Sequence, residues 1–296
     1  MRLTDRRRLP ALSAAFITMV FWGFSFIASK YALNKGVPPL TLAFLRYAML
    51  TPCAALLTQA RTKSLRVSFR DLLRISPTAL LGITAYYYCE YTGMMYTSAS
   101  IAAVMLATIP ILAALTESIV FKQKIAPVVW IGVLLSAIGA AMVTYAPGGA
   151  GTAFGYFMLF MTCVSWVLYI MLVRGVAADI EPLRLLSWQC VIALITLAPL
   201  AFNERARWAP LTPDVLLVTA ILALVCSGAC YIMYNYALVA LGSIITSSML
   251  NIIPIVSVIT GALLLGERMT PLQLSGGAVI IVSTLLVVSM SKKQTE

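Results

Sequence analysis

The sequence predicts an all-α integral membrane protein in which ten transmembrane helices form two inverted five-helix repeats. The chain of 296 residues is 61% hydrophobic and 10% charged, and a soluble domain of this length does not bury so much apolar surface. The chain also resembles itself without a gap, so that Trp22 aligns with Trp166, 144 positions later. Two halves that each cross a membrane five times must insert upside down relative to one another, an arrangement known in transporters.

Ten apolar stretches follow one another, each near the 20 residues that a spanning helix needs. Proline and glycine separate them, for example at 38–39 and 147–149, since these residues break helices. The first stretch follows four arginines, as the core of a signal peptide would, but its Trp22 has a partner in the second half, so we interpret it as a retained span. The predicted spans are 13–33, 40–60, 72–96, 99–121, 126–145, 153–173, 183–202, 213–238, 243–265 and 271–290.

Positive charge predicts the orientation of these spans. With the N-terminus inside, fourteen of the 21 lysines and arginines fall in inner segments and four in outer loops, and such residues concentrate on the cytoplasmic side. We therefore expect a multi-pass protein of the inner (plasma) membrane with both termini cytoplasmic. The predicted organisation is a cytoplasmic tail (1–12), a first repeat (13–146), a linker (147–152), a second repeat (153–290) and a second cytoplasmic tail (291–296).

The composition argues against several classes of function. The chain has no histidine, which excludes a histidine metal site or proton relay, and we expect neither a metal nor another cofactor. A net charge of +11 would suggest nucleic acid in a soluble protein, but here the basic residues sit in short loops and tails, so no nucleic-acid partner is expected. The spans lack the nucleophile with its base, or the paired acids, that an enzyme needs. We expect no enzymatic activity.

Three segments resemble the drug/metabolite transporter superfamily, and specifically its ten-helix EamA type. The first span contains FWGFSF at 21–26, and the junction before the tenth span reads LGER at 265–268. The matching junction of the first half reads FKQK at 121–124, where Gly-Glu is usual in the family at the second and third positions. The resemblance covers about residues 12–290. It implies a central cavity among spans one to four and six to nine, with spans five and ten peripheral, but it does not identify the substrate.

The third and eighth predicted spans carry a polar, aromatic face. Tyr87, Glu90 and Tyr91 lie on one helix face by their spacing. The repeat aligns Tyr231 and Asn235 with the two tyrosines. Lipid contact explains such paired faces poorly, although tyrosine also serves the interfacial belts. We expect these five residues to line a cavity and bind substrate, because aromatic rings and hydroxyl groups suit apolar or cationic solutes.

Glu90, Lys30 and Arg46 form a predicted cluster of ionisable groups. Glu90 is the one carboxyl well inside a span, where a charge costs about 2.5–3.5 kcal/mol. Lys30 and Arg46 lie at a similar depth in the first two spans. A structural ion pair, with Lys30 extending to the interface, and a binding or proton-coupling cluster both remain open.

Further candidates stand in the middle of spans. Trp22 and Trp166 are paired by the repeat, and belt tryptophans prefer helix ends, so we expect both to line the cavity. Asn251 should face protein or water, because an amide is unfavourable in lipid, and it is a candidate substrate ligand. Pro110 and Pro254 each remove a backbone hydrogen bond, which makes them candidate hinges as well as static kinks.

The predicted function is secondary transport of small metabolites. We expect an exporter of amino acids or related amphipathic solutes that works by alternating access, with a small-molecule substrate and the lipid bilayer as partners. A proton-coupled efflux transporter of drugs or amines is the alternative, and a facilitative channel a further one. Small residues repeat on the fifth and tenth spans, which fits close packing within the chain or a homodimer through these two helices.

Overall fold

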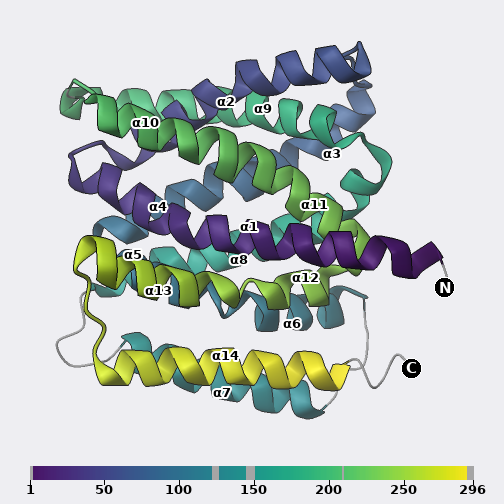
Figure 1. Cartoon of the computed structure of the whole chain (residues 1–296). Coiled ribbons are helices and arrows are strands. Elements are labelled where there is room, and N and C mark those ends of the chain that lie inside the picture. The colour runs from purple at the N-terminus through teal and green to yellow at the C-terminus, as the bar shows by residue number, and fades with distance from the viewer. Residues whose placement is uncertain (1–2, 122–126, 145–150, 209, 292–296) are drawn as a thin grey trace.

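The computed structural model describes residues 3–121, 127–144, 151–208 and 210–291, and these residues are mostly helical (Figure 1). The elements are α1 (Leu3–Asn34), α2 (Pro39–Thr62), α3 (Phe69–Ala79), the π-helix η1 (Leu80–Ala85), α4 (Tyr86–Met95), α5 (Ala99–Leu106), α6 (Ile109–Phe121), α7 (Pro127–Thr144), α8 (Ala153–Asp179), α9 (Pro182–Asn203), the 3-10 helix η2 (Arg205–Arg207), α10 (Pro213–Ile221), the π-helix η3 (Leu222–Ala229), α11 (Cys230–Leu241), α12 (Ser243–Met249), α13 (Ile252–Leu265) and α14 (Pro271–Ser291).

Seven helical segments of the described residues are long and apolar enough to cross a membrane. They are Leu9–Asn34, Pro39–Thr62, Ala99–Val120, Ala153–Asp179, Pro182–Asn203, Pro213–Leu241 and Ile245–Leu265. The predicted spans 72–96, 126–145 and 271–290 are not among the seven. The first of these three corresponds to α3, η1 and α4, whose opening turns carry Arg70, Asp71 and Arg74. The all-α membrane class is confirmed.

The elements repeat at the offset seen in the sequence. The π-helices η1 and η3 occupy corresponding places, and so do the breaks between α5 and α6 and between α12 and α13. Each break comes just before a proline, since α6 begins at Ile109 and α13 at Ile252. Pro110 and Pro254 therefore stand in a first turn, where no backbone N–H is needed. The kink expected within a continuous helix is instead an interruption, and a hinge role remains a prediction.

The two halves interlock. Helix α1 of the first half packs against α11 and α13 of the second, and α8 of the second half packs against α4 and α6 of the first. Helices α2 and α9 pair with one another across the halves. Helix α1 begins and α14 ends at the same end of the bundle (Figure 1). We call this the terminal end, and the other the opposite end.

Helices α7 and α14 form a pair at one edge of the bundle (Figure 1). A Cβ atom on Gly139 would lie 2.7 Å from the carbonyl oxygen of Gly276, and one on Gly276 would lie 2.6 Å from that of Gly139. The backbones approach closely because neither residue has a side chain. Small residues of the two helices thus pack on one another within one chain, and a homodimer through these helices stays a prediction.

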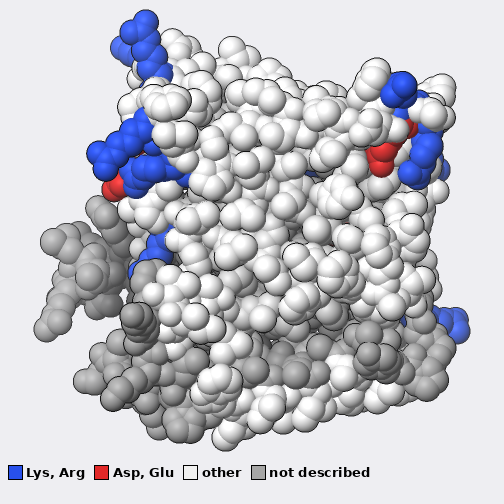
Figure 2. All heavy atoms as spheres, turned by 180° about the vertical axis from the view of Figure 1, so that it is seen from behind, with Lys and Arg blue, Asp and Glu red and all other residues white. Residues whose placement is uncertain are grey.

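One face of the molecule has charged ends and an uncharged middle. Figure 2 shows Lys, Arg, Asp and Glu gathered toward the two ends of one face, with a broad band free of charge between them. Many large apolar side chains are exposed, among them Leu263 and Ile119 at 77% and 74%. So much exposed apolar surface suits a lipid environment.

Candidate functional site

A small cavity lies between the two halves. Five residues that the sequence predicts to bind substrate line it: Trp22 on α1, Tyr87 and Glu90 on α4, Trp166 on α8 and Tyr231 on α11. Tyr86, Ser25, Phe26, Leu106, Leu250 and Ile253 complete the wall. The space open to the centre of a water molecule is about 20 Å³, which is room for about one water. The structure therefore presents this cavity in a contracted form, too small for a metabolite.

Aromatic rings from both halves pack against one another at the cavity. The ring centroids of Trp22 and Trp166 are 5.3 Å apart in a T-shaped arrangement. Tyr231 lies 5.7 Å from Trp22 and 6.0 Å from Trp166, again edge to face. Such edge-to-face pairs are favoured by the quadrupoles of the rings. The two tryptophans that the repeat aligns thus meet at the boundary between the halves.

The π-helices fix the orientation of two of these rings. The indole Nε1 of Trp22 donates to the carbonyl of Cys226 in η3 at 2.9 Å. The hydroxyl of Tyr231 donates to the carbonyl of Gly82 in η1 at 2.8 Å. Each half thus offers a π-helix carbonyl to an aromatic side chain of the other half. Single π-turns inside helices are frequent at functional sites, and their places beside this cavity fit that rule.

Arg46 lies behind the cavity wall, and the groups that it hydrogen-bonds or stacks on are neutral. Its side chain is 1% exposed, and its guanidinium donates to the hydroxyl groups of Ser227 and Tyr91. It also stacks on the ring of Tyr87 at 4.8 Å, a cation–π contact. Among the described residues, no carboxylate lies within ion-pair distance of Arg46. The predicted ion pair between Glu90 and Arg46 is therefore not formed in this conformation.

Glu90 faces the cavity with a carboxylate that has no cation at ion-pair distance within the described part of the chain. It is 4% exposed and interacts with the hydroxyl of Tyr86 and, electrostatically, with Arg46. A buried carboxylate held this way is available to a ligand cation or a proton. The described residues contain no group of three or more His, Cys, Asp or Glu placed to hold a metal ion.

Lys30 lies apart from this pair, toward the opposite end. Its Nζ donates to the carbonyls of Met94 at 2.5 Å and Thr97 at 2.9 Å, at the C-terminal end of α4. Glu267 attracts it electrostatically. A cation at a helix C-terminus is stabilised by the helix dipole. In this conformation Lys30 contacts helix-end carbonyls and lies apart from Glu90 and Arg46, which is the geometry of the structural alternative, and its role in transport stays a prediction.

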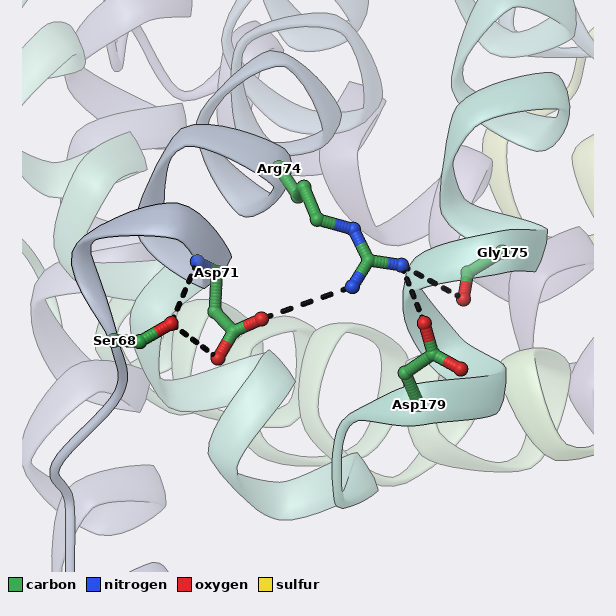
Figure 3. Close-up of polar contacts among 5 residues, drawn as sticks. All are labelled: Ser68, Asp71, Arg74, Gly175 and Asp179. Carbon is green, nitrogen blue, oxygen red and sulfur yellow. Dashed lines mark hydrogen bonds and ion pairs between the residues drawn. The ribbon is translucent and has the colours of Figure 1, made fainter.

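Polar contacts join the two halves at both ends of the bundle. At the opposite end, Glu267 accepts from Ala99 N and Ser100 N, both at 2.9 Å, and from Ser100 Oγ at 2.6 Å. At the terminal end, Arg74 of α3 donates to Asp179 of α8 at 2.5 Å, and it also pairs with Asp71 at 3.7 Å (Figure 3). The cavity thus lies between two ends at which polar contacts join the halves.

The chain matches one protein-family model twice, once in each half. The model of the EamA-like transporter family matches residues 9–145 and 153–289. The chain belongs to the EamA-like transporter family. It is a membrane transporter of this family and of the drug/metabolite transporter superfamily, as the motifs indicate.

Relatives of this EamA-like transporter cover almost its whole length. An uncharacterized transporter of Archaeoglobus fulgidus is 23% identical over 92% of this chain and 96% of its own. A probable terminal-alkyne amino-acid exporter of Streptantibioticus cattleyicolor is 24% identical over 94% of this chain and 93% of its own. A protein of known crystal structure shares the fold with a TM-score of 0.67 at 17% identity, over 97% of this chain and 98% of that one.

Three predicted substrate ligands of this EamA-like transporter do not line the cavity. Tyr91 accepts from Arg46 at 2.8 Å and contacts Ser29 at 3.1 Å. Asn235 accepts from the hydroxyl of Tyr169 at 3.0 Å. Asn251 is 4% exposed, and neither atom of its amide finds a hydrogen-bond partner in the described part of the chain. Two of the three thus support neighbouring side chains, and Asn251 faces protein at the break between α12 and α13.

The sequence alone missed one residue that faces Glu90 and several that join the halves. Ser227 holds Arg46, Tyr86 faces Glu90, and Glu204 accepts from both the backbone N–H and the hydroxyl of Thr41 at 2.7 and 2.9 Å. Glu267 stood in a family motif without an assigned role. Tyr86 could have been found as a neighbour of Tyr87, whereas the contacts of the others link residues more than 160 positions apart and leave no local signal.

Proposed function

We propose that this EamA-like transporter crosses the membrane ten times as two inverted repeats, covering 13–146 and 153–290. An even number of crossings agrees with α1 beginning and α14 ending at one end of the bundle (Figure 1). The excess of Lys and Arg in the predicted inner segments favours both termini in the cytoplasm of an inner (plasma) membrane. Odd-numbered halves inserted upside down also agree with the reciprocal packing of α1 and α8.

Within this topology, we propose a secondary transporter that exports amino acids or related amphipathic solutes by alternating access. One observation carries the proposal: equivalent side chains of the two halves line one cavity, and contacts between the halves join them at both ends of the bundle. A rocking motion that breaks the contacts at one end while keeping those at the other would expose the cavity to one side at a time. The 20 Å³ cavity would then be the closed intermediate between the two open forms.

The chemistry of the cavity favours a solute with an ammonium group. A carboxylate without a partner cation attracts a positive charge, and the faces of Trp22, Trp166 and Tyr231 stabilise it further. The same rings suit an apolar side chain. Arg46, one tyrosine ring behind the wall, supplies positive potential for a carboxylate. An amino acid carries all three features, and one relative bears the name of an amino-acid exporter.

The alternative, proton-coupled efflux of drugs or amines, is favoured by the same Glu90. A buried carboxylate that is free of ion pairs can hold either a proton or an ammonium group, and exchange of the two would couple their movements. Export of an amino acid by this route would be accelerated by an opposing pH gradient. Facilitated transport would not respond to that gradient.

Uptake and efflux in proteoliposomes test the proposal. The purified chain would be given a panel of amino acids, amines and organic acids, with and without a pH gradient. We expect saturable transport of solutes that carry an ammonium group, and a loss of about tenfold in kcat/KM for Trp22→Ala, from the aromatic contacts removed. Trp130→Ala is the matched control, because Trp130 is 54% exposed on α7.

Glu90→Gln separates the two candidates. Proton coupling requires the carboxyl, so this variant should lose the response to the pH gradient while Tyr88→Phe, at a 40% exposed neighbour on α4, keeps it. Unchanged pH dependence of Glu90→Gln rules out coupling through this residue. Transport that never saturates, or that Trp22→Ala leaves intact, contradicts the binding site itself.

A further inference from the structure

A basic segment connects α2 to α3 at the terminal end of the bundle. Four of its side chains, Arg61, Lys63, Arg66 and Arg70, are exposed. None of their charged groups forms an ion pair or hydrogen bond with the described residues. Four cations within ten residues repel one another unless an anionic partner is present. The segment therefore presents positive charge that the protein itself does not neutralise.

The acidic groups nearby are already engaged. Asp71 accepts from Ser68 at 2.7 Å and pairs with Arg74, and Arg74 also donates to Asp179 (Figure 3). Arg74 is thereby held between two carboxylates. The carboxylates of this corner compensate Arg74, and the other four cations remain free for an external ligand.

The backbone of the segment is fixed although its basic side chains are free. The indole of Trp188 on α9 donates to the carbonyl of Leu65 at 2.8 Å. The hydroxyl of Thr62 donates to the carbonyl of Ser64 at 2.8 Å, and Lys63 ends α2 in the left-handed region. Four cations on an ordered backbone lose less entropy on binding than they would on a mobile loop.

Apolar side chains stand beside these cations. Phe69 and Leu73, four positions apart on α3, are 75% and 60% exposed. Residues at this spacing share a helix face, and the opposite side of α3 buries Ile75 and Thr78 in the bundle. A helical turn with aromatic and leucine side chains outward, flanked by arginine, is the composition that lies in the headgroup region of a membrane.

We propose that residues 61–73 form a docking surface for anionic phospholipids. The head-group phosphates contact Arg61, Lys63, Arg66 and Arg70, while Phe69 and Leu73 enter the boundary between head groups and acyl chains. In basic segments next to membrane helices, each positive charge raises the affinity for anionic lipids by about tenfold or less. The occupant follows from charge complementarity. The surface carries uncompensated cations, which an anionic lipid neutralises and a zwitterionic lipid does not. The apolar face beside them suits the acyl chains of either lipid.

Native mass spectrometry of the purified full chain tests this proposal. The protein would be equilibrated with equal amounts of phosphatidylglycerol and phosphatidylcholine that have identical acyl chains, and the ratio of the two bound lipids measured. We expect a preference for phosphatidylglycerol in the wild type. Arg66→Gln with Arg70→Gln should reduce it by about 30-fold, two charges at roughly 1 kcal/mol each. The preference should also weaken as salt rises.

Two further variants keep the result decisive. Arg61→Gln with Lys63→Gln removes two other charges of the same surface and should reduce the preference to a similar extent. Arg205→Gln with Arg207→Gln, an exposed pair at the opposite end, should leave it unchanged. Equal binding of the two lipids by the wild type, or an equal loss in the control, overturns the proposal. A soluble acidic partner would also leave the two lipids equally bound. The measurement needs no transport, so it stands apart from the proposed function.

Discussion

The contact of Glu267 with the N-terminus of α5 gives the sharpest test of how the halves are joined. Two side chains accept hydrogen bonds from the first backbone N–H groups of α5. The carboxylate of Glu267 accepts from Ala99 N and Ser100 N, and the hydroxyl of Ser98 accepts from Ile101 N at 3.1 Å. Ala99 and Ser100 are buried. The carboxylate comes from the other half of the chain, so its removal affects the helix and the interface between the halves together.

The expected cost of Glu267→Ala follows from these bonds. Hydrogen bonds to a charged group contribute about 1.5–3 kcal/mol each, and the loss of a helix cap costs about 0.5–2 kcal/mol. Because Glu267 is half-exposed, water compensates part of the loss, and we expect a decrease of about 3 kcal/mol in the free energy of unfolding. Glu267→Gln retains one acceptor oxygen and should cost about 1 kcal/mol.

Unfolding in mixed micelles, with increasing SDS, measures these values. A double-mutant cycle with Ser100→Ala isolates the bond to the hydroxyl, and we expect a coupling of about 1 kcal/mol between the two sites. A change below about 0.5 kcal/mol for Glu267→Ala, or additive effects in the cycle, would refute the role assigned to this carboxylate.

Three other predictions concern stability, and the last of them also uses the transport assay in proteoliposomes. Gly139→Ala places a Cβ 2.7 Å from the backbone of α14 and should destabilise the protein by about 1–3 kcal/mol, whereas Gly175→Ala, with nothing within 4 Å, should be neutral or stabilise by up to about 1 kcal/mol; equal effects would contradict the α7–α14 contact. Arg46→Lys should cost about 2 kcal/mol, because an ammonium group does not reproduce the planar fork and the stacking, and unchanged stability would count against that network. Lys30→Met should lower thermal stability but leave the KM of transport unchanged, and a tenfold rise in KM would instead assign Lys30 to the binding site.

Much of the site followed from the repeat combined with helix spacing. Trp22 and Trp166 are aligned by the repeat and stand in the middle of apolar stretches, which predicts a shared site, and their rings meet at the cavity. Tyr87 and Glu90 were chosen from one helix face, and both line the same cavity. The structure places these side chains together because a helix fixes which residues share a face and the repeat pairs the faces of the two halves; that they bind substrate stays a prediction.

The remaining contacts depend on distances that no sequence pattern encodes. Tyr91 shares a face with Tyr87, and their ring centroids are 5.1 Å apart, yet Tyr87 lines the cavity while Tyr91, one turn further along α4, accepts from Arg46 outside its wall. Arg46 and Glu90 have opposite charges and similar depth, yet Arg46 reaches Ser227, 181 positions away. The register of α4 also depends on η1, and a π-turn rotates every later side chain relative to those before it. None of these features changes hydropathy, so the pattern of apolar residues does not reveal them.

The π-turns also bear on the order of events in the duplication of the five-helix unit. The alignment of the halves keeps one offset from Trp22 with Trp166 to Pro110 with Pro254, across the stretches that contain η1 and η3. The additional residue that widens a turn is thus present in both copies, or the offset would change between these pairs. The simplest account is that the widening predates the duplication. The ancestral five-helix unit then already had the π-helix carbonyl that, in each half, accepts a hydrogen bond from an aromatic side chain of the other half.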